Sequence, residues 1–353
     1  MFIQGLGTAV PQWAYTQQEC WEALKKSSLC QKLTGRSQAI LRKVLNGQNG
    51  IERRHASVES LAEAFDMTPD VLHARFVRHA PALAAEAARK ALADAEVEPG
   101  QIDGVIISTC TGYLCPGLTS YVSERLGLPA EVQALDLVGQ GCGAALPNLR
   151  TADALVASGQ CQRVLSICVE VCSAAFYLDD DPGVLISTSL FGDGAGAAVL
   201  SLSPNPGRRI EWKGCCSLLQ PEHRDLLRFE QKQGMLRNRL GAQVPALAAV
   251  CARQVLERGL AQAGLARSDI RAWIFHPGGR DVLRAICEGL ELAEADVCWS
   301  AGVLRDYGNL SSPSVFFVLQ SALAGSAADG PWWMSSFGAG FSCYGALIEV
   351  QRQ

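Results

Sequence analysis

The segment Pro81-Ala-Leu-Ala-Ala-Glu-Ala-Ala-Arg89 recurs as Pro245-Ala-Leu-Ala-Ala-Val-Cys-Ala-Arg253, with seven of nine positions identical. Each copy opens a predicted helix that leads, through a short turn, into an apolar strand at 102–108 or 270–276. Repeats in solenoid proteins return every ~20–50 residues, and this period is much longer. The chain is therefore predicted to be a duplicated domain, in which Ser108 and His276 occupy corresponding positions.

Helices and strands are expected to alternate within each half. We predict helices at 81–95, 118–126 and 142–158, strands at 105–108, 132–137 and 163–169, and final strands at 195–202 and 344–350. Strands that are apolar throughout are typical of sheets covered by helices on both faces. The predicted fold is α/β, a duplicated five-layer αβαβα body. Its halves are residues 1–205 and 206–353, with a boundary in the Pro- and Gly-containing segment 203–208.

The composition is typical of a soluble globular protein. Of the 353 residues, 48% are hydrophobic and 19% are charged, and no apolar run reaches the roughly 20 residues of a membrane helix. Without such a run, and with no basic segment before Phe2, we expect a cytoplasmic protein without membrane insertion. The net charge of -4 gives no overall attraction to nucleic acid, so no nucleic-acid partner is expected. The 14 cysteines lack the spacing of a zinc site, so no metal is expected and most cysteines should be small core residues.

One cluster of positive charge lies between Lys32 and His55 and includes Arg36 and Lys43. A charge run of this kind is often a solvated helix face. The alternative is a rim that binds the phosphate groups of a polyanionic ligand.

Three residues far apart in the chain carry groups that could act together. Cys142, His276 and Asn309 each lie beside glycines where a predicted strand gives way to a turn or helix. Reactive groups are often held in such places. A thiol can attack a carbonyl carbon, an imidazole can keep the thiol ionised, and an amide can donate a hydrogen bond to an oxyanion. Taken singly, each residue has a structural alternative: a buried core thiol, a histidine bonded to backbone, and a helix N-cap.

Five motifs, in order along the chain, resemble those of the type III polyketide synthases, the chalcone-synthase-like branch of the thiolase superfamily. They are Gly141-Cys-Gly143, Leu190-Phe-Gly-Asp-Gly194, His276-Pro-Gly-Gly279, Tyr307-Gly-Asn-Leu-Ser-Ser312 and Phe337-Gly-Ala-Gly340. The resemblance runs from about Ile3 to Val350. It implies a homodimeric acyltransferase that loads an acyl group from acyl-CoA, decarboxylates malonyl-CoA, and repeatedly condenses and then cyclises the product. It implies CoA thioesters as substrates, no further cofactor and no acyl carrier protein.

The resemblance also implies roles for individual residues. Cys142 would be the nucleophile, a thiolate paired with a His276 imidazolium, and His276 and Asn309 would hold the thioester carbonyl and stabilise the enolate. Phe191 resembles the gatekeeper between the CoA tunnel and the reaction cavity. Further cavity candidates are Cys110, Thr111, Cys172, Ala175, Ser187, Asn238, Ser311, Gly338 and Ala339. Cys115 matches the position where a partner subunit reaches across the dimer, and Arg36, Lys43 and Arg280 are candidates for binding CoA.

Two departures from the family pattern bear on the cavity. Ser336 and Ala339 replace a glycine and the proline of the usual Gly-Phe-Gly-Pro-Gly loop, which should make the loop less rigid. Asn238 stands near the position of a second gatekeeper phenylalanine of plant chalcone synthases. The cavity mouth is therefore expected to be wider and more polar.

The expected starter follows from small residues at Cys172, Ala175 and Ser187, the last of which we place in a strand before Phe191. They favour a fatty or medium-chain acyl-CoA, giving alkylpyrone or alkylresorcinol-type products. The alternative within the family is an aromatic or short starter giving a chalcone-like or small phenolic product. Outside it, a ketoacyl-ACP synthase III would share the three residue types in this order, and a cysteine hydrolase could use the same groups.

Overall fold

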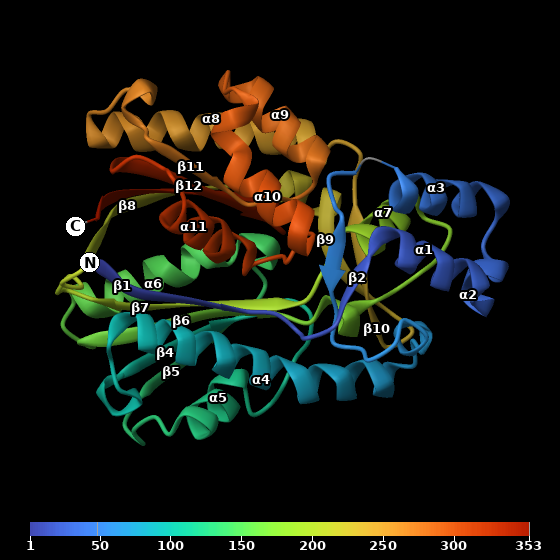
Figure 1. The fold of residues 1–353 in the computed structure, drawn as a ribbon, viewed down its shortest axis with the longest axis horizontal. Helices are drawn as coiled ribbons and strands as arrows, with labels where there is room; N and C mark the ends of the chain where they lie inside the picture. Colours follow the sequence, from blue (N-terminus) through green and yellow to red (C-terminus); the bar gives the residue numbers. More distant parts are fainter. Residues whose placement is uncertain (48, 353) are drawn as a thin grey trace.

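The computed structural model of the protein describes residues 1–47 and 49–352. Figure 1 shows five layers, in which two sheets alternate with three layers of helices. Helices α4 and α5 cover the outer face of one sheet, α8 and α9 cover the outer face of the other, and α6 and α11 lie between the sheets. The predicted fold class is confirmed.

The first sheet has the order β5-β4-β6-β7-β1, with β4 parallel to β5 and β6 and with β7 antiparallel to both of its neighbours. Its strands are β1 (Phe2–Ala9), β4 (Gly104–Ser108), β5 (Gln133–Leu137), β6 (Arg163–Glu170) and β7 (Gly194–Ser201). The helices of this half are α4 (Pro69–Ala95), α5 (Leu118–Leu126) and α6 (Ala145–Ala157).

The second sheet has the order β11-β12-β13-β8, and only its β11–β12 pair is parallel. Its strands are β8 (Arg208–Leu219), β11 (Ala272–Phe275), β12 (Gly330–Gly338) and β13 (Ser342–Arg352). The helices are α8 (Val244–Ala263), α9 (Arg280–Leu290), α10 (Cys298–Tyr307) and α11 (Ser314–Ala324). A single residue pair between β1 and β8, Phe2 with Glu211, connects the two sheets at one edge.

The repeated alanine-rich segments explain how closely the outer helices pack on the sheets. In the first half, a Cβ atom added at Gly5 of β1 would lie 2.3 Å from the carbonyl oxygen of Ala91 in α4. Ala84, Ala88 and Ala91 of this helix are fully buried. Small residues on both surfaces therefore bring helix and strand into direct backbone contact, which larger side chains would prevent. The core between the sheets is filled by α6 and α11 with larger side chains, including Leu146, Leu149, Phe316 and Leu319.

A further group of elements lies at one end of the layers, where the N-terminal helices meet α7 (Figure 1). It contains β2 (Ala14–Thr16), α1 (Gln17–Lys26), α2 (Ser28–Lys32), α3 (Gly35–Asn46), β3 (Arg53–His55), α7 (Pro182–Leu190), β9 (Leu227–Lys232) and β10 (Met235–Leu240). This group is important for function because both cavities described below are lined partly by it. In the described part of the chain, no helix has the length and apolar character needed to cross a membrane.

Three local predictions were wrong. Helix α4 begins at Pro69, twelve residues before the predicted start, and carries Pro81 in its interior. Ser187 lies in helix α7 rather than in a strand, because the apolar run before Phe191 begins with Asp181 as a side-chain cap and Pro182 in the first turn. The segment at Cys142 is a 3₁₀ turn, Gly141–Gly143, and the α-helix starts only at Ala145.

Candidate active site

Cys142 is presented by a turn that only small residues can form. Gly141 has φ 55°, and a Cβ atom there would lie 3.0 Å from the backbone nitrogen of Ala339. At Gly143 an added Cβ atom would lie 2.9 Å from Cε2 of Tyr344. The glycines around Cys142 thus allow the second half of the chain to pack directly against the turn. Cys142 itself is 9% exposed.

The second half adds further hydrogen bonds to this turn. The hydroxyl of Ser336 in β12 donates to the carbonyl oxygen of Gly143 at 3.0 Å. Tyr344 of β13 donates its phenol proton to Oε1 of Gln140 at 2.6 Å. We expected the replacement of glycine by Ser336 to loosen this region; Ser336 instead lies within β12 and adds a contact between the halves.

His276 follows β11 and is almost completely buried, with 1% of its surface exposed. Its backbone nitrogen donates to the carbonyl of Ser335 at 2.8 Å, which continues the pairing of β11 with β12. The imidazole lies edge-on to the Phe337 ring at 5.1 Å between centroids. Its Nδ1 atom has no hydrogen-bond partner among the described residues. The side chain is therefore not bonded to backbone, which was the structural alternative for this histidine.

The amide of Asn309 is held in one orientation by two backbone groups. Its Nδ2 atom donates to the carbonyl of Gly278 at 3.2 Å, and its Oδ1 atom accepts from the nitrogen of Ser311 at 2.8 Å. Its own backbone nitrogen donates to Leu190 at 2.9 Å, and Asn309 forms a parallel bridge with Phe191. Helix α11 begins five residues later, at Ser314, so Asn309 is not its N-cap.

Burial sets the protonation of the Cys142 and His276 side chains. It raises the pKa of the Cys142 thiol to about 12; the hydrogen bond from Ser311 acts in the opposite direction, and the charge of Glu170 raises the pKa further. Burial lowers the pKa of His276 to about 3. Both shifts favour the uncharged form. The expected thiolate–imidazolium pair is thus not the favoured state here, and the hydrogen bond at Sγ of Cys142 comes from Ser311 Oγ, 3.1 Å away.

A buried carboxylate that sequence reasoning did not select lies behind this thiol. Glu170, at the end of β6, is fully buried and accepts hydrogen bonds from Ser312 at 2.6 Å, Thr111 at 2.9 Å and the Cys110 nitrogen at 3.0 Å. Ser311 Oγ lies 3.4 Å from the same carboxylate. Burial raises the pKa of Glu170, and these donors lower it. An acidic residue ending an otherwise apolar strand was the available signal in the sequence.

Two cavities meet at Phe191. The large cavity, about 810 Å³, is lined by Cys142, His276 and Asn309, and also by Phe337, Lys43 and Arg280. The small cavity, about 100 Å³, is lined by the predicted residues Thr111, Cys172, Ala175, Ser187, Asn238 and Ser311. Among the described residues Phe191 alone lines both cavities. The three candidate catalytic side chains therefore share one space, and a phenylalanine ring separates it from another.

The other predicted residues lie around these cavities rather than in them. Gly338 and Ala339 pack against the turn of Cys142, and Cys110 lies in the Glu170 network, with Sγ 3.3 Å from Oε1. Cys115 is exposed and lines neither cavity of this chain. Arg36 is likewise exposed and lines neither cavity.

Comparison with known proteins agrees with the motifs. Residues 1–204 match the model of the N-terminal domain of chalcone and stilbene synthases, and residues 218–346 match that of their C-terminal domain. The chain belongs to this family of type III polyketide synthases. It is therefore an acyltransferase that carries out decarboxylative condensation with malonyl-CoA. A cysteine hydrolase and a ketoacyl-ACP synthase III are set aside by this membership.

Several relatives resemble this type III polyketide synthase along most of their length. It is 31% identical over 332 residues to the 3,5-dihydroxyphenylacetyl-CoA synthase of Streptomyces toyocaensis, covering 91% of this chain and 82% of the relative. It is 31% identical over 356 residues to the 1,3,6,8-tetrahydroxynaphthalene synthase of Streptomyces peucetius subsp. caesius, covering 98% and 92%. It is 27% identical to the alpha-pyrone synthesis polyketide synthase-like Pks18 of Mycobacterium tuberculosis, covering 99% and 91%.

Solved structures agree with the architecture of this polyketide synthase. The crystal structure of PKS-I from the brown alga Ectocarpus siliculosus superimposes with a TM-score of 0.89 at 26% identity, covering 98% of this chain and 97% of the other. The structure of 1,3,6,8-tetrahydroxynaphthalene synthase from Streptomyces coelicolor gives 0.88 at 23% identity, covering all of both chains, and shows the shared fold.

Proposed function

We propose that Cys142 carries the growing acyl chain and that His276 and Asn309 activate its thioester partners. The observation that carries this assignment is that all three side chains line the same large cavity, although they come from different halves of the duplicated fold. A thiol, a neutral imidazole and an oriented amide are together sufficient for acyl transfer.

Because the buried thiol is uncharged, its proton must leave as the acyl-CoA binds. His276, a neutral imidazole that lines the same cavity, is proposed to accept that proton as the sulfur–carbon bond forms. The Cys142 sulfur then attacks the thioester carbonyl carbon, the resulting oxyanion accepts hydrogen bonds from the imidazolium and from Asn309, and collapse expels CoA sulfur, which takes the proton. When malonyl-CoA follows, loss of carbon dioxide leaves an enolate that accepts hydrogen bonds from Asn309 and from His276, now a neutral imidazole in its Nε2–H tautomer.

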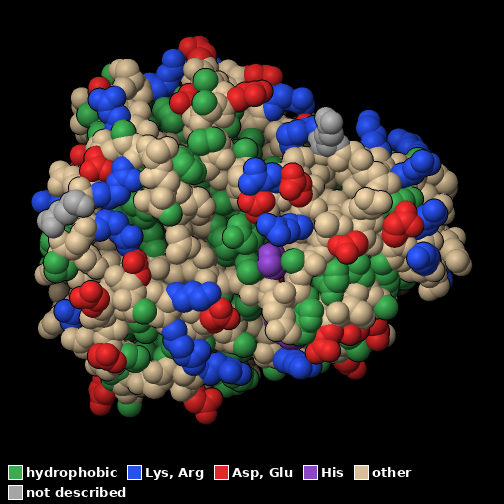
Figure 2. All heavy atoms as spheres, viewed as in Figure 1, with side chains coloured by type: hydrophobic (Ala, Val, Ile, Leu, Met, Phe, Trp, Pro, Cys, Tyr) green, Lys and Arg blue, Asp and Glu red, His purple; other side chains and the backbone are tan. Residues whose placement is uncertain are grey.

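Lys43 and Arg280 are proposed to bind the phosphates of CoA, since both line the large cavity. Figure 2 shows Lys and Arg side chains, with some acidic ones among them, over the end of the molecule formed by α1, α2 and α3. Helix α3 also contributes Lys43 to the lining of this cavity. Arg36 belongs to that surface but not to the cavity lining. We therefore assign it general electrostatic attraction rather than direct contact.

The starter is proposed to be an alkyl acyl-CoA, giving an alkylpyrone or alkylresorcinol-type product. Support comes from the small residues Cys172, Ala175 and Ser187 in the lining of the small cavity. The Mycobacterium tuberculosis relative is named for alpha-pyrone synthesis. The second candidate, an aromatic or short starter with a phenolic product, is favoured by the names of the two Streptomyces relatives.

We also propose that the active form is a homodimer joined through β5. This strand is the outer edge of the first sheet, and Leu135 and Val138 beside it are 39% and 61% exposed. Unpaired sheet edges with exposed apolar side chains are ready to pair with another chain. Leu135→Glu should shift the mass measured by light scattering from dimer to monomer, whereas Leu219→Glu, at another exposed position, should not. A wild-type monomer would contradict the proposal.

The catalytic assignment is tested with a labelled acyl-CoA starter and carboxyl-labelled malonyl-CoA. Cys142→Ala should lose protein-bound label and all product but keep release of labelled carbon dioxide, because the enolate is stabilised by His276 and Asn309. His276→Ala and Asn309→Ala should lose that release. Cys172→Ala is the matched control, a half-buried thiol in the small cavity that should keep both steps. Full synthesis by Cys142→Ala would overturn the assignment.

A further inference from the structure

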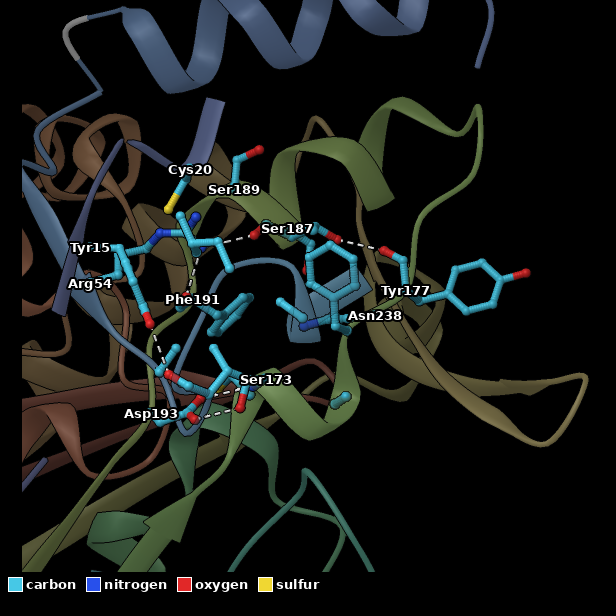
Figure 3. A pocket seen from close by; sticks show the side chains of 18 of the residues that line it. Tyr15, Cys20, Arg54, Ser173, Tyr177, Ser187, Ser189, Phe191, Asp193 and Asn238 are labelled. Carbon is cyan, nitrogen blue, oxygen red and sulfur yellow. Dashed lines mark hydrogen bonds between the residues drawn. The ribbon is translucent and has the colours of Figure 1, made fainter. Parts of the chain in front are cut away.

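The small cavity continues beyond the residues expected to line it. Its lining also includes Cys20 and Leu24 of α1 and Leu41 and Leu45 of α3. Figure 3 shows Phe191 in the middle of this lining, with Cys20 and Ser189 on one side of it and Asp193 and Ser173 on the other. The N-terminal helices, which carry the basic outer surface, therefore also contribute an inner apolar wall.

This wall is a packed hydrophobic layer. Leu24, Leu41 and Leu45 are at most 4% exposed and belong to one cluster with Trp21 of α1 and Leu185 of α7. Such side chains close a cavity without offering any hydrogen bond. A ligand that reaches them can only gain by burying apolar surface.

Several polar groups in the lining are already occupied by the protein. Arg54 donates to Gln17 Oε1 at 2.9 Å and to the carbonyl of Phe191 at 2.9 Å. The Tyr15 hydroxyl donates to Val58 at 2.9 Å, and the Ser189 hydroxyl donates to Leu185 at 2.8 Å. Because these polar groups are already hydrogen-bonded within the protein, they are not free to bond a ligand. A ligand therefore meets a mainly apolar environment in this part of the cavity, although several of its lining residues are polar.

Cys142 itself lines only the large cavity, but the small cavity comes within one side chain of it. Ser311 lines the small cavity, and the same Ser311 hydroxyl lies 3.1 Å from the Cys142 sulfur. A chain attached at that sulfur would have to pass Ser311 and the Phe191 ring, which separates the two cavities, to reach α1 and α3. At about 100 Å³ the space is well below the ~300–1,000 Å³ of pockets that enclose whole ligands, so it suits the tail of a substrate rather than all of it.

We propose that Cys20, Leu24, Leu41 and Leu45 form the binding site for the terminal end of an alkyl starter chain, and that they set the longest chain accepted. The proposal rests on the alkyl-starter function proposed above and assigns the wall of the site to the N-terminal helices. Each methylene buried along this route should raise kcat/KM by up to about fourfold, until the methyl end reaches Leu41 and Leu45. Longer chains should then lose that gain.

The test measures kcat/KM for straight-chain starters from acetyl-CoA to palmitoyl-CoA, together with carbon dioxide release from malonyl-CoA. Cys20→Phe fills the space and should move the optimum to shorter chains, while acetyl-CoA is used as well as by the wild type. Gln18→Phe is the matched control, because Gln18 is exposed on the same helix and outside the lining. Leu45→Ala removes part of the wall and should move the optimum to longer chains.

The outcomes separate this proposal from those on which it rests. An unchanged chain-length optimum in Cys20→Phe overturns it, whether or not Leu45→Ala folds. An equal loss with acetyl-CoA and with long starters also overturns it, because Cys20 would then act on the whole enzyme. If the wild type prefers aromatic starters and still releases carbon dioxide normally, the alkyl-starter function itself is contradicted. If the wild type fails to release carbon dioxide from malonyl-CoA, the catalytic assignment is contradicted.

Discussion

The hydroxyl of Ser336 donates a hydrogen bond to the carbonyl of Gly143 at 3.0 Å, although the two residues are 193 positions apart. This bond joins β12 of the second half to the turn that presents Cys142. At this position the family usually has a glycine, which could not make the bond. This bond is one of two by which the second half holds the turn of the nucleophile, the other being that from Tyr344 to Gln140.

Ser336→Ala is therefore expected to lower the free energy of unfolding by about 1 kcal/mol, the usual contribution of one hydrogen bond, and to slow acyl loading of Cys142. Urea unfolding and single-turnover loading measure the two effects. Ser335→Ala is the matched control, because its hydroxyl bonds to the Tyr344 carbonyl in β13 instead. Equal slowing of acyl loading in both variants would show that the bond to Gly143 has no special role.

Alkylation of Cys142 in the free enzyme should depend strongly on pH. Since burial raises the pKa of this thiol to about 12, its thiolate fraction should grow by about tenfold per pH unit across the neutral range. The rate of iodoacetamide labelling at Cys142, followed by peptide mass spectrometry, should still rise above about pH 8.5, where a free cysteine levels off. A plateau reached near pH 6 would instead demonstrate a preformed thiolate–imidazolium pair.

The stability of the protein should fall with acid because of His276. Burial lowers its pKa from the ordinary value of 6.5 to about 3 in the folded state, so the unfolded chain binds the extra proton first. The histidine's stabilising contribution is complete above about pH 6.5 and is lost as the pH falls toward 3, with a slope of about 1.4 kcal/mol per unit at most. The comparison is between wild type and His276→Gln in urea unfolding at several pH values. Parallel curves would contradict burial of a neutral imidazole.

Phe191 should control passage between the two cavities, since its ring lies where they meet. Phe191→Ala is expected to join the large and small cavities and to broaden the range of starters and product lengths, with little effect on carbon dioxide release from malonyl-CoA. Product mass spectrometry with a starter panel provides the readout. Phe176→Ala serves as a control, because Phe176 lines only the small cavity. A product range unchanged from wild type would remove the gatekeeper role.

Two prolines show where sequence patterns mislead. Pro245 lies in the first turn of α8, where a missing backbone N–H costs nothing, but Pro81 in the matching segment lies inside α4, which extends twelve residues further toward the N-terminus. The same repeat thus marks a helix start in one half and a helix interior in the other. Local patterns predict which segments are helical better than they predict where helices begin.

The amino-acid sequence alone determined the duplicated fold and the family, because alternation of apolar segments and glycine-flanked motifs are local properties of the chain. It also singled out Cys142, His276, Asn309 and Phe191, which the structure places around one cavity. Only the tertiary structure decided that burial shifts the pKa of the thiol and of the imidazole toward their uncharged forms, that the buried Glu170 lies beside the Ser311 that bonds to the thiol, and that α1 and α3 close the small cavity. Contacts between distant residues, and the pKa shifts that follow from them, arise only when the halves pack together, so local sequence patterns do not specify them.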